Sequence, residues 1–96
     1  YSSFQLTIEQ PLDGSRLQGT LKHLPPEIYR MKGICFLQDA PHQRILVQVV
    51  GRRVNLVSLG EWGDMRPRTE MVAIGLGADK QRLAVQAALH ACIQTV

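Results

Sequence analysis

The side chains able to do acid–base chemistry gather around one glycine-containing stretch, residues 60–69. Glu61 and Asp64 lie within it, and Glu70 follows it directly. Two carboxylates in one loop can act as general acid and general base. Arginines alternate with these acids, however, and neighbouring opposite charges on a solvated loop form ion pairs. We therefore interpret the stretch as a salt-bridged loop. A small hydrolase or lyase that uses these acids is the enzyme alternative.

Nucleophiles, metal ligands and phosphate loops do not occur at the spacing that their chemistry requires. No serine sits in a nucleophile-elbow pattern. The histidines His23, His42 and His90 do not pair with a cysteine, an aspartate or one another at a ligand spacing. The segment 75–79 lies between a strand and a helix but lacks a phosphate-loop pattern, and Asp79, which we expect to cap that helix, would repel a phosphate. The sequence predicts no catalytic residue, cofactor or metal site in these residues.

Basic residues are the next candidates for a binding site. The chain has 11 Lys and Arg against 8 Asp and Glu, a net charge of +3. Pooled on one face, such residues can bind an anion or a nucleic acid. Aromatic residues are only 5% of the chain, so no stacking platform for bases is evident. A small basic RNA-binding α+β module is therefore the alternative function. The basic pairs are Arg30 and Lys32, Arg52 and Arg53, and Arg66 and Arg68.

Composition indicates one globular domain. In 96 residues, 45% are hydrophobic and 20% are charged, enough to bury a core without disulfides or metal. No apolar run approaches the roughly 18 residues of a membrane span. Cys35 and Cys92 lie in apolar runs, so we expect buried thiols and a cytoplasmic location. Because the first residue is Tyr1, we also expect a fragment of a longer protein.

Hydrophobic periodicity predicts the element order β-α-β-β-β-β-α. We expect an α+β two-layer sandwich, in which two helices cover a mostly antiparallel sheet of about five strands, the last four forming a meander. Asp13 should cap the first helix, which Pro25 stops. The expected strands are 4–9, 29–38, 44–50, 54–59 and 71–74, with a turn at 39–43, and the expected helices are 13–24 and 79–96.

One face of this sheet is expected to lack a cover. The strands 29–38 and 44–50 are apolar on both faces, and two short helices can cover only one. We expect a missing domain or a second copy of the chain on the open face. Trp62, in the long loop, either plugs the edge of the core or anchors an interface, and we favour the plug.

Several of these residues together resemble the C-terminal domain of CobW-type GTPases. The resemblance begins with LPPEIYRMKG at 24–33 and the apolar strand at 34–37. It continues with ILVQVVG at 45–51, then Trp62, Arg68 and MVAIG at 71–75. It covers roughly residues 4–93, and the R-x-K-G box with a downstream tryptophan and an apolar-x-I-G strand is fairly specific as a set.

The resemblance implies a non-catalytic accessory domain, 1–96, of a cytoplasmic metal-chaperone GTPase. Members serve cobalt delivery for cobalamin synthesis or zinc homeostasis. Their N-terminal domain carries the phosphate loop and a cysteine-rich metal motif. GTP and a divalent metal are therefore expected there, and no cofactor is expected in this fragment. The expected partners are that GTPase domain, a metal-dependent client protein and a second copy of the chain. Neither nucleic acid nor a membrane is expected.

The family box also marks candidate interface residues. Arg30, Lys32 and Gly33 match the R-x-K-G box, and we expect them to be structural or to contact the GTPase domain. No GTPase or metal-binding residue of the family has a counterpart here, and the histidine-rich stretch of many members is not present in these residues. The full candidate interface is Arg30, Lys32, Gly33, Gln48, Trp62, Arg66 and Arg68.

Overall fold

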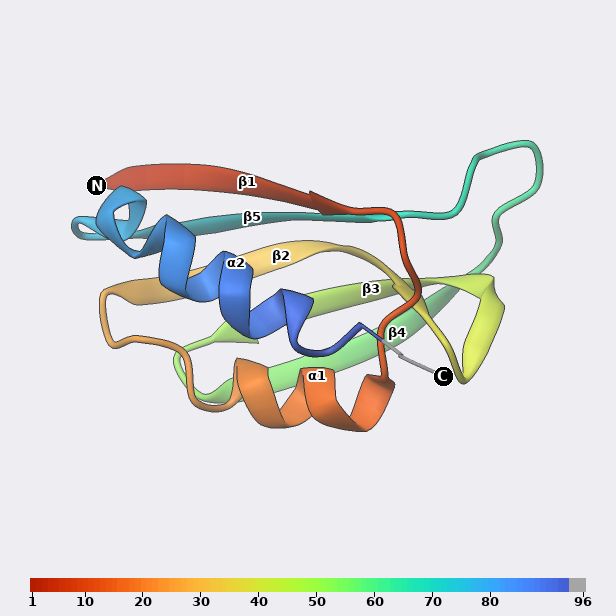
Figure 1. Ribbon diagram of the computed structural model, residues 1–96, viewed down its shortest axis with the longest axis horizontal. Coiled ribbons are helices and arrows are strands. Elements are labelled where there is room, and N and C mark those ends of the chain that lie inside the picture. The colour runs from red at the N-terminus through yellow and green to blue at the C-terminus, as the bar shows by residue number, and fades with distance from the viewer. Residues whose placement is uncertain (94–96) are drawn as a thin grey trace.

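The computed structural model describes residues 1–93 and has the predicted order of strands and helices (Figure 1). The elements are β1 (Ser2–Ile8), α1 (Gly14–Leu21), β2 (Ile28–Leu37), β3 (Ala40–Val50), β4 (Arg53–Glu61), β5 (Thr69–Gly75), the short 3-10 helix η1 (Ala78–Gln81) and α2 (Arg82–His90). The five strands form one sheet in which all neighbours are antiparallel. The predicted α+β architecture is confirmed.

The strand order, β1-β5-β2-β3-β4, corrects the expected four-strand meander. Only β2, β3 and β4 form a meander, and β5 returns to lie between β1 and β2. The exposed residues of β1, Ser3, Gln5 and Thr7, are polar, whereas those of β5, Val72 and Ile74, are apolar. A strand that is apolar on both faces gains most from a central position, and a strand with one polar face tolerates an edge. The seven residues of 62–68 give the chain the length to cross.

The first hairpin is tighter than predicted. A turn was expected over 39–43. In the structure the turn consists of Gln38 and Asp39 alone, and β3 already begins at Ala40. Pro41 fits inside the strand because pairing of β3 with β4 starts at Gln43, so no ladder hydrogen bond on that side is lost. His42 therefore lies in β3 rather than in a turn.

The two helices differ in how well their caps were predicted. Asp13 caps α1, because its carboxylate accepts a hydrogen bond from the Arg16 N–H at 2.9 Å. Asp79 does not cap α2. It lies inside η1, and its carboxylate accepts a hydrogen bond from Ser2 Oγ at 2.8 Å. Both helices also end early, α1 at Leu21 and α2 at His90.

The expected apolar stripe of the last helix is buried as far as the structure describes it. Val85, Leu89 and Cys92 are buried and Ala88 is half-buried, whereas Val96 lies outside the described residues. Leu83, which falls off this stripe, is exposed. Among residues 1–93, no helix is long and apolar enough to cross a membrane.

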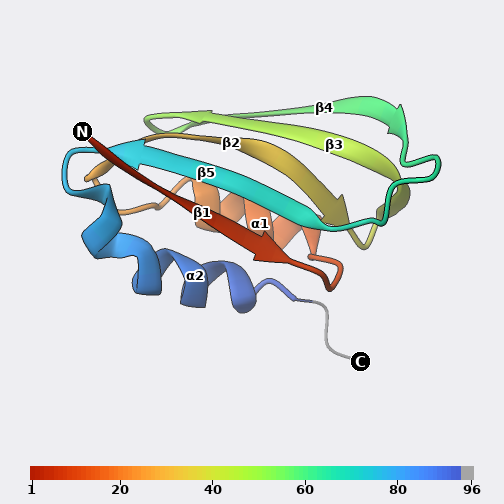
Figure 2. The same cartoon turned by 90° about the horizontal axis from the view of Figure 1, so that it is seen from above.

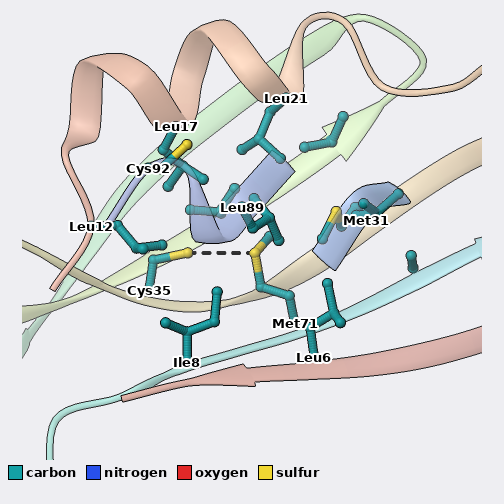
Figure 3. Close-up of a cluster of buried hydrophobic side chains, with 14 of the residues drawn as sticks. Leu6, Ile8, Leu12, Leu17, Leu21, Met31, Cys35, Met71, Leu89 and Cys92 are labelled. Atoms are coloured by element: carbon teal, nitrogen blue, oxygen red, sulfur yellow. Dashed lines mark hydrogen bonds between the residues drawn. The ribbon is translucent and has the colours of Figure 1, made fainter. Parts of the chain in front are cut away.

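Both helices lie on the same face of the sheet, and the core fills the space between them (Figure 2). Leu17 and Leu21 of α1 and Leu89 of α2 meet Met31 and Met71 of the sheet there (Figure 3). All five side chains are buried. The opposite face, which we call the outer face, carries neither helix (Figure 2).

Candidate functional site on the outer face of the sheet

Alternation along β2 decides which side chains reach the outer face. Met31 and Cys35 are buried under the helices, so Lys32, Ile34 and Phe36 point the other way. Strand register then extends this assignment to the neighbouring strands. The outer-face residues of the central strands β5, β2 and β3, together with Val57 of the edge strand β4, are Arg30, Lys32, Ile34, Phe36, Arg44, Leu46, Gln48, Val50, Val57, Glu70, Val72 and Ile74.

Aliphatic side chains run across the outer face in register. Ile34 lies opposite Leu46 of β3, and Leu46 lies opposite Val57 of β4. Val57 is 51% exposed, and Val72 and Ile74 of β5 are 41% and 43% exposed. Single exposed aliphatic residues are normal on a protein surface, but a group of them on one sheet face marks an interaction surface. The predicted uncovered apolar face is therefore present.

Six of the seven candidate interface residues come together at this face. Lys32 lies opposite Gln48 of β3 on one side and Val72 of β5 on the other. Arg30, two residues before Lys32 in β2, also points to the outer face and lies opposite Val50 and Ile74. Trp62, Arg66 and Arg68 lie in the β4–β5 loop and line a pocket over one end of the face. Gly33 is the exception, because it sits on the helix-facing side of β2 and presents no side chain.

The pocket has a volume of about 430 Å³. Trp62 is only 9% exposed and packs edge-on against Phe36, with ring centroids 6.2 Å apart. Trp62 is thus buried, as expected for a residue that plugs the core. It packs on the outer face of the sheet, however, and not in the main core under the helices. Gly60 and Gly63, at φ +95° and +61°, allow the chain to turn sharply on both sides of this ring. The lining residues are Ile34, Arg44, Trp62, Met65, Arg66, Arg68 and Glu70.

The charges around the pocket are unequally paired. Arg68 forms an ion pair with Glu70, and Arg66 lies 3.9 Å from Glu9 with both side chains mostly exposed. Such exposed pairs contribute about 0–1 kcal/mol to stability. Half-buried Arg44 forms no ion pair with any residue in 1–93. One guanidinium of the pocket therefore keeps an uncompensated positive charge.

Two buried N–H donors of pocket residues lack a partner among the described residues. They are Nε of Arg44 and Nε1 of Trp62. Arg44 does donate from Nη2 to the carbonyl oxygen of Leu59 at 2.8 Å, so its side chain is held in place while Nε stays unused. An unsatisfied buried donor costs about 1–3 kcal/mol. The pocket is thus deficient in hydrogen-bond acceptors.

Arg44 is the pocket residue that sequence reasoning missed. In the sequence it is simply the polar first residue of the expected strand 44–50. The signal in the sequence was a single cation in a strand that is otherwise apolar on both faces. Burying a charge is costly unless it is paired or hydrogen-bonded, so such a residue indicates a polar site.

The acids and histidines do not form a reactive cluster in the part of the chain that the structure describes. Glu70 is held by Arg68, while Glu61 and Asp64 are exposed. His23, just after the end of α1, shares a hydrogen bond through Nδ1 with the carbonyl oxygen of Gly19 in that helix, at 2.9 Å. No group of three or more His, Cys, Asp or Glu side chains in residues 1–93 is placed to hold a metal ion.

Comparison with known proteins decides the family. The model of the cobalamin synthesis protein cobW C-terminal domain matches residues 1–93. The chain belongs to this family. A comparison with curated proteins gave no match.

Solved structures share the CobW C-terminal fold with this chain. Zn(II)-bound YjiA GTPase from E. coli superposes with a TM-score of 0.78 at 27% sequence identity, over 97% of this chain and 30% of that chain. A Zn(II)-bound triple mutant of YjiA GTPase gives a TM-score of 0.75 at 26% identity with the same coverage. The chain thus spans less than a third of the length of these GTPases.

The R-x-K-G box of this CobW C-terminal domain has two distinct roles in the structure. Its charged members, Arg30 and Lys32, are exposed on the outer face. Gly33 pairs with Met71 of β5, and a Cβ at this position would overlap the carbonyl oxygen of Glu70. The glycine is therefore required for the close pairing of β2 and β5, whereas the two cations are free to meet a partner.

Both cysteines of the domain are buried free thiols, as predicted. Cys35 lies against Met71, with 3.6 Å between the sulfur atoms (Figure 3). Burial raises the pKa of Cys35 from its ordinary value near 9 to about 12, and a hydrogen bond with Thr69 offsets part of this rise. The thiol stays protonated at neutral pH and is a poor nucleophile.

The raised pKa of Cys35 predicts a loss of stability in alkali. In the unfolded chain the thiol ionises near pH 9, but in the folded domain it holds its proton until about pH 12. Its contribution is therefore complete below pH 9 and is lost between those values, by at most about 1.4 kcal/mol per pH unit. Urea unfolding should show the stability advantage of the native chain over Cys35→Ala shrinking from about pH 8 to about pH 10.5. A constant difference would contradict the raised pKa, because both proteins share every other titrating group.

Proposed function

We propose that this domain is a non-catalytic accessory part of a cytoplasmic CobW-like GTPase concerned with cobalt or zinc trafficking or with cobalamin synthesis. It serves interdomain packing and partner recognition. The supporting observation is the uncovered outer face, where Ile34, Leu46 and Val57 form an aliphatic row. Beside it lie Arg30 and Lys32, which form no ion pair within residues 1–93. In a family defined as the C-terminal part of a larger protein, such a face is suited to docking.

GTP and the divalent metal are assigned to the preceding GTPase domain. The likeness to a Zn(II)-bound GTPase covers only 30% of that protein's chain, so zinc need not be held by the part in common. In residues 1–93, Cys35 and Cys92 are buried on the helix side and no ligand cluster is assembled. This division leaves recognition as the role of the accessory domain.

Titration calorimetry with GTP, Zn²⁺ and Co²⁺ in separate runs tests this division of roles. The isolated domain should show no saturable binding of any of the three. Binding of GTP or of either metal with a micromolar or lower Kd would contradict the proposal, since specific sites of that strength need built ligand sets. Heat denaturation before and after each titration controls for unfolding.

RNA is the less favoured ligand of the outer face. Single-stranded RNA binding relies on exposed aromatic rings that stack on bases. Trp62 is buried against Phe36, and the remaining centre of the face is aliphatic. Arg30 and Lys32 alone would give only weak, salt-sensitive attraction to phosphates.

A further inference from the structure

We infer that the pocket under the β4–β5 loop receives a carboxylate side chain from an acidic segment of a separate partner protein, whose neighbouring apolar residues lie along the aliphatic row of the outer face. The inference deepens the proposed function, on which it rests, by naming the chemistry of the partner. It depends on three observations: the charge of the pocket, its unused donors and its place in the fold.

The pocket offers a carboxylate the charge and hydrogen bonds that it requires. Arg44 has no ion-pair partner among residues 1–93, and the ion pair of Arg66 with Glu9 is long and exposed. The unused donors are Nε of Arg44 and Nε1 of Trp62. An ionised carboxylate has two oxygens that act only as acceptors, so it can serve both donors at once. Hydrogen bonds between charged groups are also the strongest available.

Both donors are covered in the structure, so the roof of the pocket has to move when a ligand enters. Met65 is 50% exposed and the side chain of Arg66 is 75% exposed. Such side chains can turn aside without leaving a packed core. Arg44 and Trp62, by contrast, are fixed by the Leu59 carbonyl oxygen and by the Phe36 ring. The two donors are therefore held in place, while the exposed side chains of Met65 and Arg66 beside them can turn aside.

The floor and surroundings of the pocket favour a peptide over a free anion. Ile34 forms part of the floor and begins the aliphatic row that continues through Leu46 and Val57. A small anion would leave this row uncovered, whereas an acidic segment with apolar neighbours would bury it. Lys32 and Arg30, the next outward-facing residues along β2 from Ile34, attract further acidic side chains of the same segment.

The place of the pocket favours a separate protein over the attached GTPase domain. Ser2, at the start of β1, pairs with Gly75 at one end of the sheet. Glu70 of the pocket lies near the other end of β5, and the β4–β5 loop and the N-terminus are at opposite ends of the molecule (Figure 2). The pocket thus lies at the end of the sheet away from Ser2, where a segment of a separate protein can reach it.

The single tryptophan of the chain makes this proposal directly measurable. The probe is the blocked peptide acetyl-Leu-Glu-Val-Asp-Ile-amide, and its control is acetyl-Leu-Gln-Val-Asn-Ile-amide. The acidic peptide should shift the indole N–H resonance of Trp62 downfield and bind at least about tenfold more tightly than the control. Equal affinity of the two peptides, or an unmoved indole signal at about 5 mM acidic peptide, would overturn the inference.

Three variants locate the effect. Arg44→Gln should abolish the preference for the acidic peptide, and Arg66→Gln, at an exposed side chain, should weaken it about threefold without changing Tm. Arg16→Gln removes the same charge from helix α1 on the opposite face and should leave both affinities unchanged. If Arg44→Gln lowers Tm, a loss of peptide binding could come from partial unfolding. The peptide preference of the Arg66→Gln variant, whose Tm should not change, then decides whether the pocket binds the carboxylate. If Arg16→Gln and Arg66→Gln weakened the preference for the acidic peptide equally, the preference would follow from the net charge of the domain. That result would contradict a specific binding pocket.

Three further outcomes separate this inference from the proposed function. A decauridylate that binds more tightly than the acidic peptide, with its affinity reduced by Arg44→Gln, would replace the acidic segment by RNA. Failure of the peptide to bind, with no GTP or metal binding either, would remove the carboxylate pocket and leave the accessory role standing. Saturable GTP or metal binding would instead remove the accessory role.

Discussion

Replacing Gly33 by alanine is expected to destabilise the domain by about 3 kcal/mol or more, because the added methyl group overlaps main-chain atoms. A Cβ at this position would overlap the carbonyl oxygen of Glu70 and lie 2.6 Å from the Cα of Met71. A flexible side chain could move away from such an overlap, but main-chain atoms of a central strand cannot. The pairing of β2 with β5 would have to open, and the Tm should fall by more than about 10 °C.

Gly19→Ala is the matched control for this prediction. Gly19 lies within α1, and apart from its chain neighbours and the backbone of its own helix no atom of the described residues lies within 4 Å of where its Cβ would be. Alanine there restricts the unfolded chain and favours the helix, so we expect a gain of about 0.5–1 kcal/mol. Thermal unfolding of both variants, followed by circular dichroism, separates the two effects. A Gly33→Ala protein as stable as the native chain would show that β2 and β5 can move apart at little cost.

Truncation of Leu89 to alanine is expected to destabilise the domain by about 3 kcal/mol, within the range of about 2–5 kcal/mol for a buried leucine. Leu89 is fully buried between α2, α1 and the sheet. Helix α2 has nine residues, too few to be stable by itself, so it depends on the packing of Leu89 and Val85. Hydrogen exchange should show faster amide exchange throughout α2. Urea unfolding should measure the loss in the free energy of unfolding.

Leu83→Ala in the same helix is the control for Leu89. Leu83 is 79% exposed, so its truncation should change stability by no more than about 0.5 kcal/mol. Both changes remove the same atoms from the same helix, and helix propensity affects them equally. A loss at Leu83 as large as that at Leu89 would mean that α2 presents a different face to the sheet.

The outer face illustrates how far sequence reasoning reaches in this domain. Apolar residues on both faces of β2 and β3 predicted a sheet with too little cover, and Val50 of β3 is indeed exposed, as are Val57 of β4 and Val72 of β5. This prediction succeeded because strand alternation is a local property that the sequence displays directly. The assembly of Arg44 with Trp62 could not be predicted in this way. The two residues are brought together by the pairing of β3 with β4, and a loop then folds back over the face.

The misplaced cap shows the same limit at a smaller scale. An aspartate near the start of a helical pattern favours a cap, and at Asp13 this rule was correct. At Asp79 it was wrong, because Ser2, 77 positions earlier in the sequence, approaches as a competing partner. Local preferences of about 1 kcal/mol yield to a tertiary neighbour that offers a comparable hydrogen bond.

The sequence by itself determined the number and order of strands and helices, the burial of both thiols and the surplus of apolar sheet surface. These properties follow from periodicity and composition, which act between near neighbours in the chain. The tertiary structure alone decided that β5 lies between β1 and β2, that Gly33 must lack a side chain and that Arg44 and Trp62 share one pocket. Each of these depends on contacts between distant segments, whose free energy is gained only when the whole sheet has formed.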